Sequence, residues 1–596
     1  MKRIITISFF ITLFISCGND NETATLTETI VVKNEAFEAM LEDYYQESLK
    51  IYPLNATNLG DNRYNDLLPN ILSDEFKADE KALFTKYKDL LSQYKDEDLT
   101  EDQQLSKAIL NWDCDINLNR MTFREDLLPI NQFSTLQNSF GQLASGAGAQ
   151  PFKTVEDYNN WLKRVDGYIV WMNSAQERME EGITLKTVLP KTLIVKAIDQ
   201  FKVLSEGKVE DHLFFQPIKT LPADISEADA KILTETYTAM VKDRVIPAYK
   251  KMHQFMSASY LDAGRPSSGI AEVPNGKTYY NHLIKLYTTT SMNADEIHQL
   301  GLSEVERITA EMEKVKEQVG FEGDLKAFFD HVRTSKELMP FTEPDQVLAH
   351  FNEIHETMKP QIERLFDLKP KAAFEIRRTE TFREASASAE YNPGSQDGTR
   401  PGIFYTPIPD ATKYNVLSDE ALFLHEAIPG HHYQFSLQQE NDKLPNFRKI
   451  LWYSSYGEGW ALYTESLGKE LGLYTDPYQY FGMLSMEMHR AIRLVVDPGM
   501  HVMGWSREKA IQYSLDHEAE SEASITSEIE RYMAIPGQAL SYKIGQLKIR
   551  ALRATAEKTL GDKFNIAEFH NEILNGGCIP LNLLEAKINA WMESEK

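Results

Sequence analysis

Four residues within one short stretch, His425, Glu426, His431 and His432, carry the clearest chemical signal in this sequence. They follow the apolar run Ala421–Leu424, which favours a buried helix. Imidazole nitrogens are common zinc ligands, and a carboxylate beside them can act as a general base. The stretch therefore predicts a zinc site that activates water.

The spacing departs from the pattern His-Glu-x-x-His, in which two histidines on one helix face share a zinc ion, because Pro429 stands at the second position. On an unbroken helix His431 points about 240° round from His425, and His432 lies about 10.5 Å further along the axis. Pro429 and Gly430 weaken a helix. We expect a bulge that absorbs two residues, makes His431 the second ligand and turns His432 toward substrate or a supporting carboxylate.

A second helical pattern over residues 457–465 supplies candidates for the third ligand. Glu458 and Glu465 are seven residues apart and thus share one helix face, so one can bind the metal while the other orients a ligand histidine. Glu426 is then the base that takes a proton from water and passes it to the leaving group. Ser418 is expected to cap the helix that leads to His425.

The elements that must position these residues are mostly helices. Short strands are expected only around the Gly/Pro-rich loop between Thr381 and Thr406. We predict a mainly α fold with an N-terminal helical half, 34–265, and a catalytic half, 266–596. Apolar residues recur at three- and four-residue spacing over 36–51, 101–118, 155–181, 227–256 and 294–319.

The composition excludes some classes of partner. The 596 residues include 63 Lys and Arg against 89 Asp and Glu, a net charge of -26, which repels nucleic-acid phosphate. Of three cysteines, Cys114 and Cys578 lie in the body of the chain, and we expect two buried small apolar residues rather than a disulfide framework.

The N-terminus predicts export. Residues 1–3 are positively charged, residues 4–15 are apolar, and Ser16-Cys17-Gly18 follows, as in a bacterial lipoprotein signal. We expect a signal peptide over 1–16, a lipidated Cys17, a flexible tether over 17–33 and a periplasmic or cell-surface location. The alternative is an ordinary cleaved signal with an incidental cysteine. No later apolar stretch reaches the about 20 residues of a membrane helix, so the lipid is the only expected membrane contact.

The chain contains four conspicuous blocks, residues 425–434, 458–465, 493–501 and 531–545. In this order they resemble the bacterial family catalogued as domain of unknown function 885, whose members are lipoprotein-type proteins. Two further marks of that family stand at 397–402 and 296–301, so the resemblance covers nearly the whole chain after the signal.

That family is similar to the helical gluzincin metallopeptidases, including the carboxypeptidase Taq, thimet oligopeptidase and angiotensin-converting enzyme families. The resemblance implies a large helical zincin fold with a small β element beside a deep active-site cleft. It also implies that Glu458 is the third zinc ligand and that Glu465 supports a ligand histidine.

Related gluzincins use a His and a Tyr from C-terminal helices to stabilise the oxyanion, which makes His501 and Tyr542 the candidates here. Arg400, Arg531 and Lys543 are candidates for binding a substrate carboxylate. A purely structural role is the alternative for each of these five residues.

We therefore expect a Zn²⁺-dependent peptidase of carboxypeptidase or oligopeptidase type that acts on peptides, with its oligomeric state left open. One alternative is a zinc amidohydrolase that acts on a non-peptide amide. The other is a catalytically inactive lipoprotein that binds peptides, although Glu426 argues against it because binding needs no general base.

Overall fold

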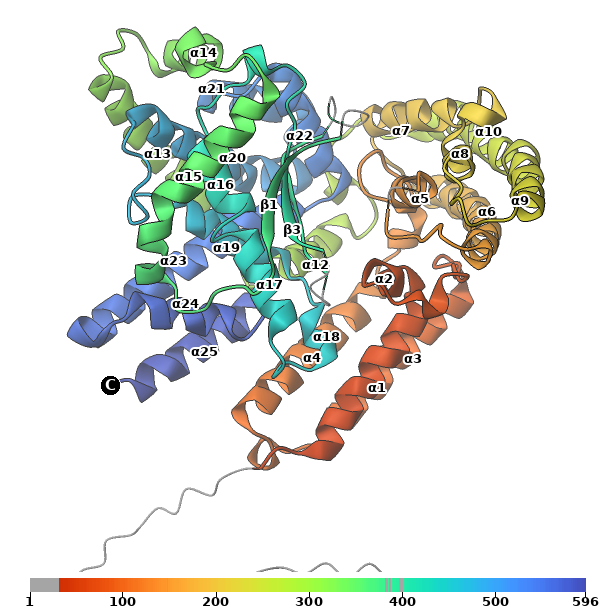
Figure 1. Ribbon diagram of the computed structural model, residues 1–596, viewed down its shortest axis with the longest axis horizontal. Helices are drawn as coiled ribbons and strands as arrows, with labels where there is room; N and C mark the ends of the chain where they lie inside the picture. Colours follow the sequence, from red (N-terminus) through yellow and green to blue (C-terminus); the bar gives the residue numbers. More distant parts are fainter. Residues whose placement is uncertain (1–31, 147, 381–383, 385–386, 396–399) are drawn as a thin grey trace, which may run out of the picture.

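The computed structural model describes residues 32–596 except 147, 381–383, 385–386 and 396–399 (Figure 1). The predicted signal peptide, Cys17 and most of the tether lie outside these residues. The described chain is mainly helical, as expected. None of its helices combines the length and the apolar run needed to cross a membrane.

The first group of helices precedes residue 121. Its members α1 and α4 coincide with the predicted segments 36–51 and 101–118 to within two residues. The caps explain the starts, because the Asn34 side chain accepts from the amide of Phe37, and the Thr100 and Gln103 side chains form a capping box. The group comprises α1 (Glu35–Ile51), α2 (Pro53–Asn58), α3 (Asp74–Leu91) and α4 (Glu101–Arg120).

The second group lies on the right of Figure 1 in orange and yellow. The predicted helix over 227–256 is present, but a π-helical turn at 241–245 interrupts it and a second follows at 256–260. The group comprises α5 (Leu136–Ala144), α6 (Val155–Leu185), α7 (Lys191–Val203), α8 (Gln216–Lys219), α9 (Glu227–Met240), α10 (Ile246–Phe255) and α11 (Leu261–Ala263).

The third group holds the candidate metal ligands and the candidate catalytic residues. Within it, α13 packs along α20, and α19 packs along α23. The group comprises α12 (Gly276–Thr288), α13 (Ala294–Gln318), α14 (Leu325–Thr334), α15 (Pro344–Leu365), α16 (Asp419–Glu426), α17 (His431–Glu440), α18 (Asn446–Lys449), α19 (Ser454–Glu465), α20 (Pro477–Val502), α21 (Arg507–His517), α22 (Glu522–Ala534), α23 (Ser541–Leu560), α24 (Ile566–Leu574) and α25 (Leu581–Ser594).

A small sheet lies in front of α16 and α17 (Figure 1). Its central strand β3 (Gly402–Thr406) pairs in parallel with β1 (Phe374–Arg378) and antiparallel with β2 (Glu390–Asn392). Strands β2 and β3 fall in the predicted region, whereas β1 lies before it, where the alternating pattern Phe-Glu-Ile-Arg-Arg was not recognised.

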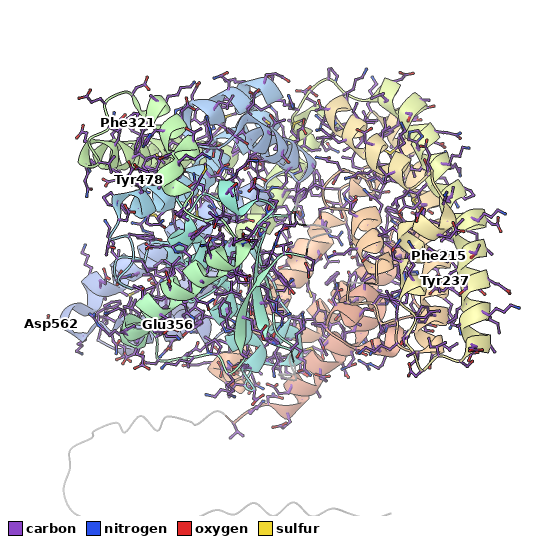
Figure 2. The ribbon with its side chains drawn as sticks, turned by 45° about the horizontal axis from the view of Figure 1, so that its top comes forward. Phe215, Tyr237, Phe321, Glu356, Tyr478 and Asp562 are labelled. Carbon is purple, nitrogen blue, oxygen red and sulfur yellow. The ribbon has the colours of Figure 1, made fainter. Side chains whose placement is uncertain are left out.

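Two hydrophobic clusters form the interior. The smaller is built from Leu72 and residues between Ile130 and Tyr260. The larger joins α1, α3 and α4 to the helices of the third group. Figure 2 labels Phe215 and Tyr237 of the smaller cluster on one side of the molecule and Phe321 and Tyr478, which pack against the larger one, on the other. The smaller cluster ends at Tyr260, near the predicted division at residue 265, while α1, α3 and α4 pack against helices that follow it.

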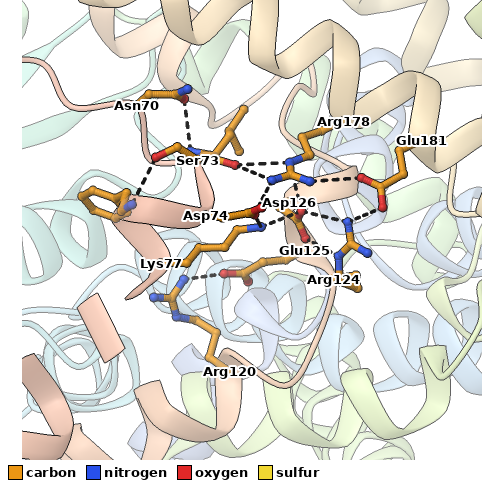
Figure 3. A network of polar contacts seen from close by, with 12 residues as sticks. Asn70, Ser73, Asp74, Lys77, Arg120, Arg124, Glu125, Asp126, Arg178 and Glu181 are labelled. Atoms are coloured by element: carbon orange, nitrogen blue, oxygen red, sulfur yellow. Dashed lines mark hydrogen bonds and ion pairs between the residues drawn. The ribbon is translucent and has the colours of Figure 1, made fainter. Parts of the chain in front are cut away.

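A polar network connects the two clusters where α3 and the end of α4 meet α6 (Figure 3). Arg178 of α6 donates to the Asp74 carboxylate at 2.6 Å, and Arg124 donates to Glu181 of α6 at 2.9 Å. Lys77 of α3 adds a bond of 2.8 Å to the buried carboxylate of Asp126. Charge-assisted bonds of this kind fix the orientation of the helices more than they stabilise the fold.

Candidate metal centre

His425, His431 and Glu458, called the cluster below, come together in the interior of the third group. The nitrogen and oxygen atoms that they direct at one another all lie within 4.8 Å. The Oε2 atom of Glu458 is 3.5 Å from Nε2 of His425 and 3.6 Å from Nε2 of His431. Four ligands held at 2.0–2.2 Å around a tetrahedral zinc ion are separated by about 3.3–3.6 Å. The two distances therefore fit two edges of such a tetrahedron.

We expected the helix that carries His425 to bulge after that residue. Instead, the helix ends. Helix α16 stops at Glu426 and α17 starts at His431, so the four residues 427–430 lie outside both helices. The peptide bond between Ile428 and Pro429 is cis. Pro429 correctly predicted that the helix is disturbed at this point, but the disturbance is a complete break and not a bulge. Its outcome is the expected one, since His431 faces His425.

Backbone crowding explains the glycine in this connection. A Cβ atom on Gly430 would lie 1.9 Å from the carbonyl oxygen of His425, closer than any side chain allows. The connection is also held from outside, since Trp460 of α19 donates from Nε1 to the Pro429 carbonyl at 3.0 Å. Thr464 of the same helix donates to the Leu424 carbonyl at 2.8 Å. Helix α19 thus fixes the connection and carries Glu458.

Ser418 does not cap α16 through its side chain. Its hydroxyl lies 3.5 Å from the carbonyl oxygen of Gly482 instead. The start of α16 is held by other contacts, since the buried carboxylate of Asp419 accepts from Tyr414 at 3.0 Å and that of Glu420 accepts from the amide of Tyr474 at 2.6 Å.

Glu465 orients His425. Its Oε1 accepts a hydrogen bond from Nδ1 of His425 at 2.7 Å, and its side chain is 1% exposed. A carboxylate on Nδ1 fixes the tautomer that leaves the lone pair on Nε2, the atom directed into the cluster. His431 has no such partner, because its buried Nδ1 makes no hydrogen bond within the described chain.

The charges of the cluster are coupled. Burial lowers the pKa of His425, but the carboxylates of Glu458 and Glu465 outweigh it and raise that pKa to about 9. Burial raises the pKa of Glu458, but bonds to both histidines hold it well below its usual range.

His432 points away from the cluster. Its Nδ1 atom lies 2.9 Å from the hydroxyl of Tyr391 on β2, and its ring is buried. Burial lowers the pKa of His432 to about 4, so it is neutral at pH 7. The sequence suggested a role toward substrate or a carboxylate, and the structure gives His432 a tyrosine of the sheet as partner instead.

Glu426 and Tyr542 lie beside the cluster without partners of their own. Neither side chain makes a hydrogen bond or ion pair to another described residue, and both are partly exposed. Burial raises the pKa of Glu426, although the charges of His425 and His431 act to lower it. Burial and then the nearby Glu458 raise the pKa of Tyr542. Helix α23 brings Tyr542 there because Gly459 and Gly545 let α19 and α23 approach closely.

His501 is occupied elsewhere. Its Nδ1 accepts from the amide of Ile270 at 3.1 Å, and its Nε2 lies 3.0 Å from the carbonyl oxygen of Tyr532. Burial lowers its pKa to about 3, so the ring is neutral and fully hydrogen-bonded. Because both ring nitrogens are bound to backbone atoms, His501 has no N–H group left to donate to an oxyanion. The contacts therefore favour a purely structural role for His501.

The three predicted carboxylate binders differ in their surroundings. Lys543 is completely buried and bonds Glu487 at 2.6 Å, with Glu304 at 3.0 Å. Arg531 donates to both carboxylate oxygens of Glu528 at 2.9 Å. Arg400 is exposed, and its backbone amide donates to the Ser395 hydroxyl at 2.9 Å. None of their side chains is joined to the cluster by a described contact.

Two cavities lie away from the cluster. One of about 370 Å³ lies between residues 266–277 and 500–508 and includes His501 in its wall. Another of about 230 Å³ is lined by residues 122–128 and 270–279. Neither is lined by His425, His431 or Glu458.

Sequence reasoning missed Arg490, Trp460 and Tyr391. Arg490 of α20 lies 3.8 Å from Oε1 of Glu465, and the other two hold the 427–430 connection and His432. Trp460 lies within the 458–465 block. A tryptophan expected on a buried helix needs an acceptor for its Nε1–H group, and this need could have indicated a contact with a neighbouring segment. Nothing in the spacing of Arg490 or Tyr391 points to the site, because both reach it only through the folding of distant segments.

Comparison with known proteins gives the family and two solved structures. A crystal structure of a "putative lipoprotein" from Colwellia psychrerythraea superposes with a TM-score of 0.86 and 27% identity, covering 94% of this chain and 99% of that chain. A "putative lipoprotein of unknown function" from Shewanella oneidensis has a TM-score of 0.70 and 18% identity, covering 92% of this chain and 99% of the other, and shows a shared fold. No curated protein matches.

The family model described as bacterial protein of unknown function (DUF885) matches residues 53–588, a span that includes the cluster, Glu465 and Tyr542. This chain therefore belongs to the DUF885 family of bacterial proteins.

Proposed function

We propose that this protein is a zinc-dependent peptidase, exported and tethered by a lipid on Cys17. The cluster is the observation that supports zinc dependence. Its distances of 3.5 Å and 3.6 Å between Glu458 and the two histidines fit the edges of a zinc tetrahedron. His425, His431 and Glu458 would hold the ion and leave a fourth position open. A bound Zn²⁺ would polarise a carbonyl group and acidify a water molecule.

The protein's own residues then have separate roles. Glu426, adjacent to the cluster and without a partner among the described residues, accepts the proton of the attacking water and passes it to the leaving amine. The free hydroxyl of Tyr542 donates to the oxyanion that forms on the substrate. Glu465 keeps His425 in the tautomer that binds metal. This arrangement resembles that of the helical gluzincin peptidases, and it relies on Tyr542 without His501.

The partly exposed side chains also support a substrate cleft. Glu426, Glu458 and Tyr542 lie beside buried residues of their helices, yet each keeps some contact with solvent. Such residues lie where water, and therefore a substrate, reaches the centre. An inactive binding protein would have no need of an unpaired carboxylate beside three ligand residues, so we favour the enzyme.

Metal analysis combined with a peptide-library cleavage profile, with and without chelator, tests the proposal. We expect one zinc per chain and cleavage that the chelator abolishes. Glu426→Gln should keep the zinc and lose about 10²–10⁴-fold in turnover, since general-base catalysis contributes that much. Glu470→Gln, which changes a surface carboxylate paired with Arg553, is the matched control and should behave as wild type.

Absence of zinc, or unchanged hydrolysis by Glu426→Gln, would overturn the proposal. Zinc without cleavage of any peptide would redirect it to a hydrolase of non-peptide amides. For the tether, the support is the Ser16-Cys17-Gly18 sequence and the likeness to the "putative lipoprotein" from Colwellia psychrerythraea.

A further inference from the structure

Two arginines one turn apart on α20, Arg490 and Arg493, have N–H groups that make no hydrogen bond to any residue that the structure describes. Nη1 of Arg490 donates to the Met486 carbonyl at 3.1 Å, while its Nε is buried without a partner. Arg493 donates from Nε to Tyr532 and from Nη2 to Glu528, but its Nη1 is also buried without a partner. A buried donor left unpaired costs stability, so these atoms call for an acceptor that is not part of the chain.

Both arginines lie beside the proposed reaction centre. The guanidinium carbon of Arg493 sits 4.5 Å from the centroid of the Tyr542 ring. Arg490 is 3.8 Å from Glu465, and its charge acts on both Glu426 and Tyr542. Arg490 keeps partial solvent contact, as Glu426 and Tyr542 do, whereas Arg493 is 7% exposed. The pair therefore extends inward from the side on which the centre meets solvent.

Three arginines surround Tyr542, namely Arg490, Arg493 and Arg531. Their carboxylate partners are Glu528, which Arg493 and Arg531 share, and Glu465, which also serves His425. Glu426 and Glu458 lie nearby as well, so the support for an anion is the set of unpaired N–H groups and not an excess of positive charge.

We propose that Arg490 and Arg493 bind a carboxylate group of the peptide substrate, and that this group is the C-terminal carboxylate. A guanidinium N–H group donates strongly to a carboxylate oxygen, and Nε of Arg490 and Nη1 of Arg493 are the two nitrogens left to do so. Arg490, the more exposed of the two, is the first contact, and Arg493 completes the site once the side chains that enclose it shift. This proposal rests on the proposed peptidase function and replaces the predicted binders Arg400, Arg531 and Lys543.

Three peptides of equal length test the proposal. The length is chosen so that the zinc-loaded protein cleaves peptides of that size. They are a free acid, its C-terminal amide, and an amide whose last residue is glutamate. We expect kcat/KM for the free acid to exceed that for the simple amide by about 10²-fold, because the amide leaves a buried charge without its partner. Arg490→Gln and Arg493→Gln should bring this ratio close to one while zinc per chain stays at the wild-type value.

Arg553→Gln is the matched control, since Arg553 bonds carboxylates on the surface and should keep the ratio. Equal kcat/KM for acid and amide with wild-type protein would overturn the inference and leave the peptidase proposal intact. An amide ending in glutamate that is cleaved as well as the free acid would overturn the C-terminal assignment. Because both are wild-type measurements, they hold even where an arginine variant fails to fold.

Binding to the metal-free protein gives a readout without catalysis. Calorimetric titration with the free acid and the amide should show at least about tenfold tighter binding of the acid to wild type, and equal binding of both to Arg493→Gln. If no peptide is hydrolysed, the proposed function fails, yet this titration still tests the arginines. Equal affinity of wild type for acid and amide would refute the carboxylate site.

Discussion

Loss of the carboxylate at Glu465 should weaken zinc binding without disturbing the three proposed ligands. Glu465 is 1% exposed and accepts from Nδ1 of His425 at 2.7 Å, so the bond is short, charged and shielded from water. Substitution of such a supporting carboxylate costs about 10–100-fold in metal affinity, or about 1.4–2.7 kcal/mol. Glu465→Gln retains an acceptor oxygen and should fall at the lower end, whereas Glu465→Ala leaves Nδ1 without a partner and should fall at the upper end.

Competition with a chelator of known zinc affinity at pH 7 measures this effect directly. Glu470→Gln is again the control, because its exposed carboxylate belongs to the segment that follows the same helix and pairs with Arg553. Denaturation of each metal-free variant separates a loss of affinity from a loss of fold. If Glu465→Ala binds zinc as tightly as wild type, then His425 is not a ligand held by Glu465, and our account of the centre is wrong.

Three further predictions concern the second ligand, the buried acid of α4 and the tether. His431→Ala should lose the zinc and His432→Ala should keep it; the reverse stoichiometry would exchange their roles. Burial raises the pKa of Asp113, which accepts from Tyr453 at 2.7 Å, to about 7. The folded protein thus retains a proton that the unfolded chain releases above about pH 4, and stability falls as pH rises from about 4 to 7. Asp113→Asn should escape this loss. Its free energy of unfolding in urea should rise by about 2–3 kcal/mol relative to that of wild type as the pH goes from 5 to 8. A difference that does not change with pH would contradict the burial argument. Cys17→Ser should move the protein from the membrane fraction to the soluble fraction, and an unchanged distribution would exclude a lipid on Cys17.

Local patterns were enough to predict many of the helices. The segments 36–51, 101–118 and 294–319 carry their apolar stripes and their caps within the sequence, and α1, α4 and α13 match them closely. Strand β1 escaped because its alternation over residues 374–378 is short and its partner β3 is 28 residues away in register. Cys114 and Cys578 are buried free thiols, as composition indicated.

The candidate site was predictable in its residue types and less so in its geometry. Pro429 showed that the helix is disturbed, but the full break at 427–430 depends on Trp460 and Thr464 of a separate helix. The choice of His431 over His432 followed from counting residues along a helix. The surroundings of His501 and Lys543 did not follow from any pattern, since their partners Ile270 and Glu304 come from other helices and loops.

The two hydrophobic clusters have a consequence for the order of folding. Residues between Ile130 and Tyr260 form the smaller cluster from almost one continuous piece of chain, so it can assemble as soon as that piece is available. The larger cluster joins Phe37 and Leu110 to Phe447 and Ile588, which arrive hundreds of residues later. Helices α1, α3 and α4 thus lack the apolar partners that the third group supplies until synthesis of the chain is nearly complete. During this interval their exposed apolar faces are the part of the molecule most in need of a chaperone.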